Sequence, residues 1–368
     1  MKKQPFIIWT LRRAGGTNLA EALFSTSNCD TVEHEPFNGD RLFGYVVKNW
    51  LDEKSEEKLY SNLREILSKK VLIKHCLEII PHEVNIALAK ISKEYGYNHL
   101  FLYREYPTNR LLSLNYSQKT NIWGKEHKRK ISVNDNIFNE PINIRSLVDH
   151  ELHCRTEMGK IFSYLSMEGL SPAAVSFEDL YQFPTFDYSK YLVLNIFKHL
   201  DMEDAELDDV FLKRMLRKGS QGTSHEYKKF KNSEEFVIAA DGLPPFTLLN
   251  KKLKLKLEKN SKFNSRVFEI WPPLPSLRDG ECVLQGILLV SDSSVLKIKA
   301  CHNELSITAE YGLKSPRVSK LYPDDEPASG NSRYILPGLS VGTPYDLSVS
   351  KDSGDFENIA VLTVINEM

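Results

Sequence analysis

The stretch that decides the fold lies at the start of the chain, where residues 5–18 read PFIIWTLRRAGGTN. Its first part is rich in apolar and β-branched residues, which is typical of a buried parallel strand. Two glycines follow shortly afterwards, and a helical pattern begins at Thr17. A strand that passes through a glycine turn into a helix is typical of the first unit of an α/β protein.

This glycine turn has the chemistry of an anion-binding loop. Gly15 and Gly16 let backbone N–H groups approach a ligand closely, and the following helix adds its N-terminal donors and dipole. Arg13 offers a guanidinium fork for phosphate or sulfate oxygens, and Thr17 offers a hydroxyl as helix cap or ligand donor. The turn lacks the lysine of GxxxxGK[ST], which disfavours a nucleotide triphosphatase. A plain strand–helix turn is the structural alternative, but the position after the first strand favours a ligand site.

Strands and helices alternate through the first part of the chain. After the first strand, short apolar runs predict strands at 30–34, 71–74, 99–103 and 173–177. Helical patterns cover 17–25, 53–69, 82–95, a segment from about 107, 144–167, 187–199 and 205–217. This alternation predicts an α/β fold with a P-loop-like parallel sheet flanked by helices.

The pattern changes in the last third of the chain. Residues 251–262 read KKLKLKLEKNSK. One interpretation is a basic face that binds nucleic acid or glycan. A solvated edge strand or a linker is favoured, because edge strands often carry lysine. Beyond Phe268, short alternating or apolar runs are separated by turn signals, which predicts a small antiparallel β-sandwich. The expected organisation is an α/β domain over 1–245, a linker over 246–265 and an accessory β-sandwich domain over 266–368.

Composition narrows the class of protein. The chain has 368 residues, of which 41% are hydrophobic and 26% charged, so we expect two folded domains and no extensive disorder. The formal net charge of -1 offers no global basicity for nucleic acid, and anion binding must come from local sites. Five scattered cysteines without a CxxC pair favour buried free thiols. The N-terminal apolar run is too short for a signal peptide or a membrane span, which predicts a cytoplasmic protein.

A second anion site is predicted one strand further along. Residues 100–113 read LFLYREYPTNRLLS, which places Arg104 at the end of a strand and Ser113 within the next helix. A guanidinium fork and a hydroxyl form a phosphate clamp if that helix packs back across the strand end. The structural alternative is a surface arginine and a neutral mid-helix serine.

Together the two sites resemble those of the sulfotransferase family. RRAGGTN (12–18) is similar to the family's 5′-phosphosulfate loop, and YREYPTNRLLSLNYS (103–117) is similar to its 3′-phosphate segment. HEPF (34–37) resembles the acidic element of bacterial and carbohydrate sulfotransferases, and SQKTNIWG (117–124) resembles a segment of bacterial trehalose-sulfotransferase-like enzymes. VSFEDL (175–180) is similar to a later strand that carries YEDL in the family. The resemblance extends over roughly residues 5–240.

The resemblance implies an activity and a donor. It implies transfer of a sulfuryl group from 3′-phosphoadenosine-5′-phosphosulfate (PAPS) to a hydroxyl of a sugar or other polar alcohol, without a metal ion. The expected partner is thus a small-molecule or glycan acceptor and no nucleic acid. The residues expected to bind PAPS are Arg13, Ala14, Gly15, Gly16, Thr17, Asn18, Arg104 and Ser113. Serine is common in the family at positions 14 and 16, so backbone groups must hold the phosphosulfate here. RKGSQG (217–222) either closes over the donor, as the family's RKG loop does, or forms a plain basic helix end.

Two residues compete for the role of general base. The acceptor hydroxyl must lose its proton, and a carboxylate or an imidazole can take it. By resemblance, Glu35 corresponds to the residue that serves as the general base in carbohydrate-type sulfotransferases. IKHCLEIIP resembles the KTHLP element of cytosolic sulfotransferases, shortened by one residue, in which the lysine assists the leaving group and the histidine is the base. We predict Glu35 as the base, Lys74 as the charge stabiliser and His75 as the rival base.

The alternative to this activity is a non-catalytic or kinase-like nucleotide-binding α/β protein. A kinase would need a lysine in the glycine turn and an acidic Mg²⁺ ligand set, and the sequence shows neither.

Overall fold

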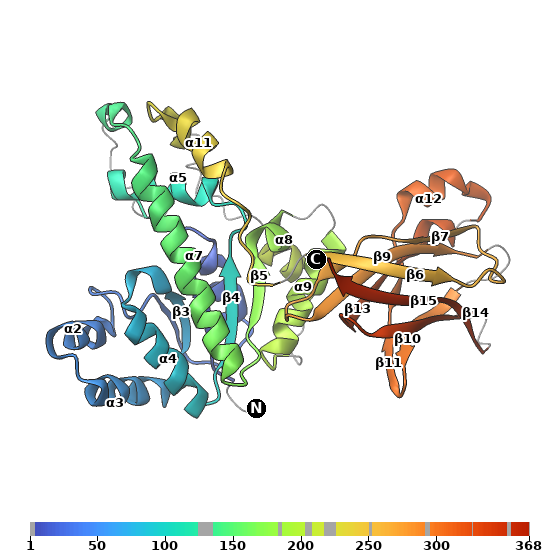
Figure 1. The fold of residues 1–368 in the computed structure, drawn as a ribbon, viewed down its shortest axis with the longest axis horizontal. Helices are drawn as coiled ribbons and strands as arrows, with labels where there is room; N and C mark the ends of the chain where they lie inside the picture. Colours follow the sequence, from blue (N-terminus) through green and yellow to red (C-terminus); the bar gives the residue numbers. More distant parts are fainter. Residues whose placement is uncertain are drawn as a thin grey trace. The chain divides into compact units, whose positions relative to one another are not determined.

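The computed structural model describes residues 4–123, 135–182, 186–202, 208–216, 226–249, 252–290, 295–325, 327–351 and 355–367. The chain divides into two compact units, Met1–Leu248 and Leu249–Met368. The first unit holds a sheet flanked by helices, and the second consists mainly of strands, as Figure 1 shows. None of the helices in the described residues is long and apolar enough to cross a membrane.

The first unit is built on a parallel five-stranded sheet. Its strands are β1 (Phe6–Thr10), β2 (Val32–His34), β3 (Leu72–Cys76), β4 (Asn98–Tyr103) and β5 (Ala173–Ser176). They lie in the order β2-β3-β1-β4-β5, and every neighbouring pair is parallel. All five residues of the central strand β1 are fully buried, which explains its unbroken apolar run. The α/β fold predicted from the sequence is confirmed.

Strand order places a ligand-binding edge beside the glycine turn. β1 has β3 on one side and β4 on the other, so the sheet grows in both directions from β1. Open parallel sheets bind ligands at the carboxyl ends of the strands, at the point where the direction of growth changes. The glycine turn follows β1 at this edge, and the ends of β3 and β4 flank it.

Helices of the first unit connect and cover these strands. They are α1 (Gly16–Phe24), α2 (Gly44–Glu53), α3 (Glu56–Leu67), α4 (His82–Glu94), α5 (Thr108–Thr120), α7 (Ile144–Met167), α8 (Phe177–Tyr181), α9 (Phe186–His199), α10 (Asp209–Met215) and α11 (Ser233–Asp241), with 3₁₀ turns η1 (Leu77–Ile79), η2 (Asp135–Asn139) and η3 (Tyr227–Lys229). The long helix α7 crosses the sheet (Figure 1), and its Phe162 packs edge-on against Phe101 of β4 at 5.2 Å between ring centroids.

One predicted strand is corrected. The family-like VSFEDL segment was expected to be a strand, but β5 ends at Ser176 and Phe177–Tyr181 form helix α8. Ser176 caps this helix, since its Oγ accepts a hydrogen bond from the Asp179 backbone N–H at 3.0 Å. A serine cap followed by acidic residues in the first turn favours a helix start over a continued strand.

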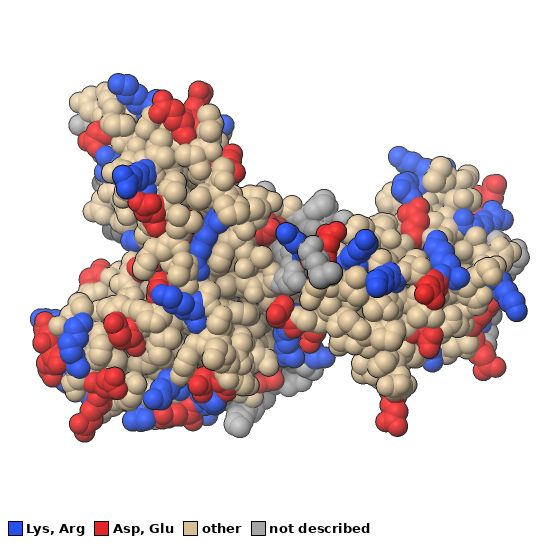
Figure 2. Space-filling model, viewed as in Figure 1, with Lys and Arg blue, Asp and Glu red and all other residues tan. Residues whose placement is uncertain are grey.

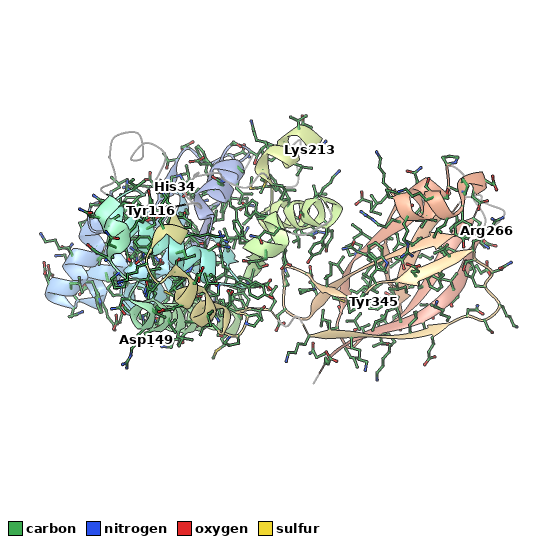
Figure 3. All side chains as sticks on the ribbon, turned by 90° about the horizontal axis from the view of Figure 1, so that it is seen from above. His34, Tyr116, Asp149, Lys213, Arg266 and Tyr345 are labelled. Atoms are coloured by element: carbon green, nitrogen blue, oxygen red, sulfur yellow. The ribbon has the colours of Figure 1, made fainter. Side chains whose placement is uncertain are left out.

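The second unit is an antiparallel β-sandwich, as predicted. Its strands are β6 (Leu253–Lys259), β7 (Val267–Ile270), β8 (Leu274–Pro275), β9 (Glu281–Leu289), β10 (Val295–His302), β11 (Leu305–Thr308), β12 (Glu310–Leu313), β13 (Arg333–Ser340), β14 (Pro344–Lys351) and β15 (Phe356–Asn366); short helices are α12 (Pro316–Leu321), η4 (Pro323–Asp325) and η5 (Ser329–Asn331). One sheet has the order β11-β10-β14-β15-β6 and the other β12-β13-β9-β7, with β8 paired to β9. Apolar side chains of both sheets form one core, in which Tyr345 (labelled in Figure 3) is buried.

The lysine–leucine alternation belongs to this sandwich and corrects the predicted linker over 246–265. Within that range Leu253–Lys259 form β6, an edge strand paired with β15. Its leucines pack against the core, whereas Lys254 and Lys256 are exposed. This two-residue period is what a strand with one buried face requires, and lysines on an edge strand discourage pairing with another chain.

Residues 1–248 are expected to fold without the second unit. Each unit has its own apolar core, and the division falls directly after Leu248. A chain truncated after Leu248 should be soluble and unfold in one cooperative thermal transition. Circular dichroism and size-exclusion chromatography check this result. Aggregation of the truncated chain would mean instead that the sandwich covers apolar surface of the first unit.

Candidate functional site

The turn after β1 contains two left-handed backbone conformations. Arg13 has φ 68° and Gly15 has φ 92°, and the Ala14 N–H closes the turn by donating to the Leu11 carbonyl at 3.2 Å. Helix α1 begins at Gly16 with Gly15 as its N-cap, so Thr17 is not the cap that the sequence suggested. No described side chain caps this helix, and Thr17 and Asn18 are exposed in its first turn. The N-terminal donors of α1 therefore face a position suited to an anion.

Close packing explains both glycines. A Cβ at Gly15 would lie 3.0 Å from the Phe177 ring, and the residue's positive φ disfavours a side chain in any case. A Cβ at Gly16 would lie 2.8 Å from the Thr10 methyl group and 3.2 Å from Cε of Lys74. A serine at position 16 would thus need these neighbours to move. The stem of Lys74 rests directly against the turn.

Lys74 and Glu35 form an ion pair on one side of this turn. The nearly buried Lys74 Nζ contacts a Glu35 carboxylate oxygen and lies 3.3 Å from Cys76 Sγ. Glu35 follows β2 directly with φ 54°, and its N–H donates to the Lys74 carbonyl at 2.7 Å. β2 and β3 are neighbours in the sheet, and that adjacency brings the two residues together.

The charges of this pair stabilise each other. Burial would raise the pKa of Glu35, but attraction to the Lys74 ammonium and hydrogen bonding with it lower that pKa. Burial would lower the pKa of Lys74, but Cys76 and Glu35 together raise it. At neutral pH the site therefore presents a carboxylate, which can accept a proton, beside a cation.

His75 points away from this pair. Successive strand residues face opposite sides of the sheet, so Lys74 faces α1 while His75 faces α4. His75 Nε2 lies 2.7 Å from Asn85 Oδ1 of α4, and its ring packs edge-on against Trp9 and Phe37. Burial lowers the pKa of His75 to about 4, although the hydrogen bond with Asn85 acts in the opposite direction. The rival base thus lies in an enclosed, mainly aromatic surrounding.

On the other side of the turn, the two predicted anion motifs meet. Arg13 Nε donates to Ser113 Oγ of α5 at 2.6 Å, and its NH1 donates to the Trp123 carbonyl at 3.0 Å. Tyr227 of η3 donates its hydroxyl proton to the same Ser113 Oγ at 2.9 Å. Tyr227 could not be predicted from the sequence, since no motif surrounds it and 114 residues separate it from Ser113.

Arg104 lies close to this cluster but stacks on an aromatic ring. Its guanidinium carbon is 3.6 Å from the centroid of Phe177, and its buried Nε has no hydrogen-bond partner among the described residues. Burial is the main cause that lowers the pKa of Arg104 to about 10; Glu178 raises it, and the charges of Arg110 and Arg13 lower it further. In the predicted clamp, Arg13 is the arginine in direct contact with Ser113, and Arg104 stands nearby with a donor directed at no described acceptor.

A buried ionic network holds the turn in place. The Arg12 backbone N–H and side-chain Nε both donate to Glu78 Oε1, at 2.7 and 3.2 Å. Arg110 of α5 donates to the Arg12 carbonyl at 3.3 Å and pairs with Glu151 of α7. Arg155 Nε contacts the other Glu151 oxygen at 2.8 Å. Arg12 is therefore engaged inside the protein, whereas Arg13 reaches the Ser113 cluster.

Other predicted features give less information. The RKGSQG segment at 217–222 and Gly124 of SQKTNIWG lie outside the described residues. Figure 2 shows lysine and arginine intermixed with acidic residues over the visible face, in keeping with the net charge of -1. An anion would be attracted by the local groups at the turn more than by a broad basic surface.

Comparisons with known proteins add little to this geometry. No protein-family model matches the chain, and no curated protein matches it significantly. One solved structure, from a study of the PezAT chromosomal toxin-antitoxin system of Streptococcus pneumoniae, is similar over 64% of this chain and 88% of its own. Its sequence identity is 12% and its TM-score is 0.27, a level of likeness from which neither fold nor function follows.

Proposed function

We propose that the chain is a PAPS-dependent sulfotransferase that acts on a hydroxyl of a sugar or another polar alcohol. The observation that supports this best is the arrangement around one glycine turn at the carboxyl edge of the sheet. The Lys74–Glu35 pair lies on one side of the turn, and the Arg13–Ser113 contact lies on the other. The Lys74–Glu35 side suits removal of a proton beside a developing negative charge. The Arg13–Ser113 side suits binding of a phosphate group.

Each group has a definite role in the proposed reaction. Backbone donors of Gly15, Gly16 and the first turn of α1 would hold the phosphosulfate, since anions favour such helix starts. Lys74, whose stem touches Gly16, would stabilise charge on the leaving phosphate. Glu35, ionised at neutral pH, would take the proton of the acceptor hydroxyl.

The other end of the donor would meet Ser113, Arg13 and Arg104. The buried Arg104 Nε with no described partner fits an anionic acceptor supplied by a ligand, because unpartnered buried donors are costly. Lys74, Arg13 and Arg104 already supply positive charge to balance the negative charge of the donor, so the proposal includes no metal ion.

The proposal predicts selective loss of affinity for a 3′-phosphate. Arg104→Ala should weaken binding of adenosine 3′,5′-bisphosphate by about 10- to 100-fold, because a charged hydrogen bond contributes about 1.5–3 kcal/mol. Binding of adenosine 5′-phosphate should change little, since that ligand lacks the 3′-phosphate. Isothermal titration calorimetry measures both affinities.

A matched control is Arg64→Ala, which removes an exposed arginine paired with Glu94 and should leave both affinities unchanged. If Arg104→Ala weakens the binding of both ligands equally, the clamp assignment is wrong.

Thermal-shift measurements with ATP test the alternative function. A ligand at a hundredfold over its dissociation constant stabilises a protein by about 2.7 kcal/mol. Stabilisation by ATP but not by the bisphosphate would favour the kinase-like alternative.

A further inference from the structure

The hydroxyl of Ser113 sits between two hydrogen-bond donors. A serine hydroxyl can accept two hydrogen bonds and donate one. Arg13 Nε fills one acceptor position, and a guanidinium has no acceptor capacity, so the direction of this bond is fixed. The Tyr227 hydroxyl fills the other. The single proton of Ser113 must therefore be donated elsewhere.

The helix does not take up this proton. Serine and threonine within helices often donate to the carbonyl four residues earlier. Thr120 on the same helix does so, with 2.7 Å between its Oγ1 and the Tyr116 carbonyl. Ser113 makes no such bond in the part of the chain that the structure describes, although only 7% of its surface is exposed.

We propose that Tyr227 is a positioning residue that, together with Arg13, fixes the Ser113 hydroxyl as a hydrogen-bond donor to a phosphate group of the ligand. Naming the ligand as a nucleotide phosphate rests on the proposed function; the orientation of the hydroxyl rests on the contacts alone. An anion is the acceptor that suits this place, because the guanidinium of Arg13 is in direct contact with Ser113.

The environment of Tyr227 suits a positioning role. Its ring is buried in an apolar cluster and lies 5.6 Å from the ring of Tyr116, so the phenol oxygen is held by packing (Tyr116 is labelled in Figure 3). Arg13 reaches Ser113 with a left-handed backbone, which is uncommon for a residue other than glycine and clusters at functional sites. Two distant segments thus orient the same hydroxyl.

A double-mutant cycle separates positioning from packing. Calorimetry on the full chain measures the affinities for inorganic phosphate and for adenosine 3′,5′-bisphosphate in the wild type, Tyr227→Phe, Ser113→Ala and the double variant. Tyr227→Phe keeps the ring and should weaken binding of both ligands by about three- to tenfold, the effect of one neutral hydrogen bond. In the Ser113→Ala background the same change should have almost no further effect, because its target is gone.

Tyr116→Phe is the matched control. It removes a hydroxyl from the same cluster and should leave both affinities and the melting temperature close to those of the wild type. The proposal is overturned if Tyr227→Phe has no effect, if its effect is the same with and without Ser113, or if the wild type binds neither ligand. Binding of inorganic phosphate with the expected coupling, but not of the bisphosphate, would contradict the proposed function while supporting the role of Tyr227.

Discussion

Glu35→Gln is expected to lower the turnover of sulfuryl transfer by about a hundred- to ten-thousandfold, the usual effect of removing a general base. The amide keeps the shape of the side chain but cannot accept the proton of the acceptor hydroxyl. Affinity for adenosine 3′,5′-bisphosphate should stay nearly constant, since Lys74 remains in place against the turn. A PAPS-dependent assay with sugar acceptors measures the turnover. Running it with and without a chelator tests the expectation that no metal ion is needed.

His75→Asn is the matched comparison for this prediction. His75 contacts Asn85, Trp9 and Phe37 on the side of the sheet opposite Lys74, so we expect the variant to lose stability more than turnover. Normal turnover in Glu35→Gln together with an inactive but folded His75→Asn would reverse the assignment.

The pH profile would not separate these two candidates. Burial alone would raise the pKa of Glu35, but the charge and hydrogen bond of Lys74 outweigh burial and hold that pKa below its ordinary value. Burial lowers the pKa of His75 to about 4. Either group would therefore be deprotonated and competent as a base well below pH 6.5, the ordinary pKa of histidine. The assignment must be made from the variants.

Glu151→Gln is expected to lower the free energy of unfolding by about 3–5 kcal/mol, the usual cost of breaking a buried ion pair by removing one partner. Glu151 lies between the fully buried Arg110 and the nearly buried Arg155, and a neutral amide would leave both cations without their counter-ion. Urea unfolding followed by fluorescence measures the change. Because Arg110 also holds the Arg12 carbonyl, phosphate affinity should fall as well.

The control lies on the same helix. Asp149 (labelled in Figure 3) pairs with Arg145 at 3.7 Å, and both side chains are largely exposed. Asp149→Asn should change the free energy of unfolding by less than about 1 kcal/mol. A loss of the same small size in Glu151→Gln would show that the network does not stabilise the fold.

The same carboxylate predicts how stability depends on pH. Burial would raise the pKa of Glu151, but Arg110 and Arg155 lower it below its ordinary value of 4.5. A lowered pKa in the folded state contributes stability above the unfolded pKa, and this contribution is lost as pH falls through the folded pKa. The wild type should therefore lose stability more steeply below pH 4.5 than Glu151→Gln does.

Local patterns determined most of the fold. The unbroken apolar run of β1, the glycines after it and the alternation of strands with helices predicted the parallel sheet, and the two-residue periods near the C-terminus predicted the sandwich. The start of α8 also has a local signal, since Ser176 can cap a helix and Asp179 follows three residues later. These features depend on neighbouring residues, so the sequence displays them directly.

The contacts of the candidate site were decided by tertiary structure. The sequence placed Glu35 and Lys74 near strand ends, Arg13 in the glycine turn and Ser113 within a helix. The pairing of β2 with β3 joined the first two, and the packing of α5 joined the last two. Tyr227 carries no signal in its own segment and gains its place only by packing near Ser113. Local sequence sets periodicity and turns, whereas a site made of residues about 40 to 114 positions apart depends on strand order and side-chain packing, which no single segment encodes.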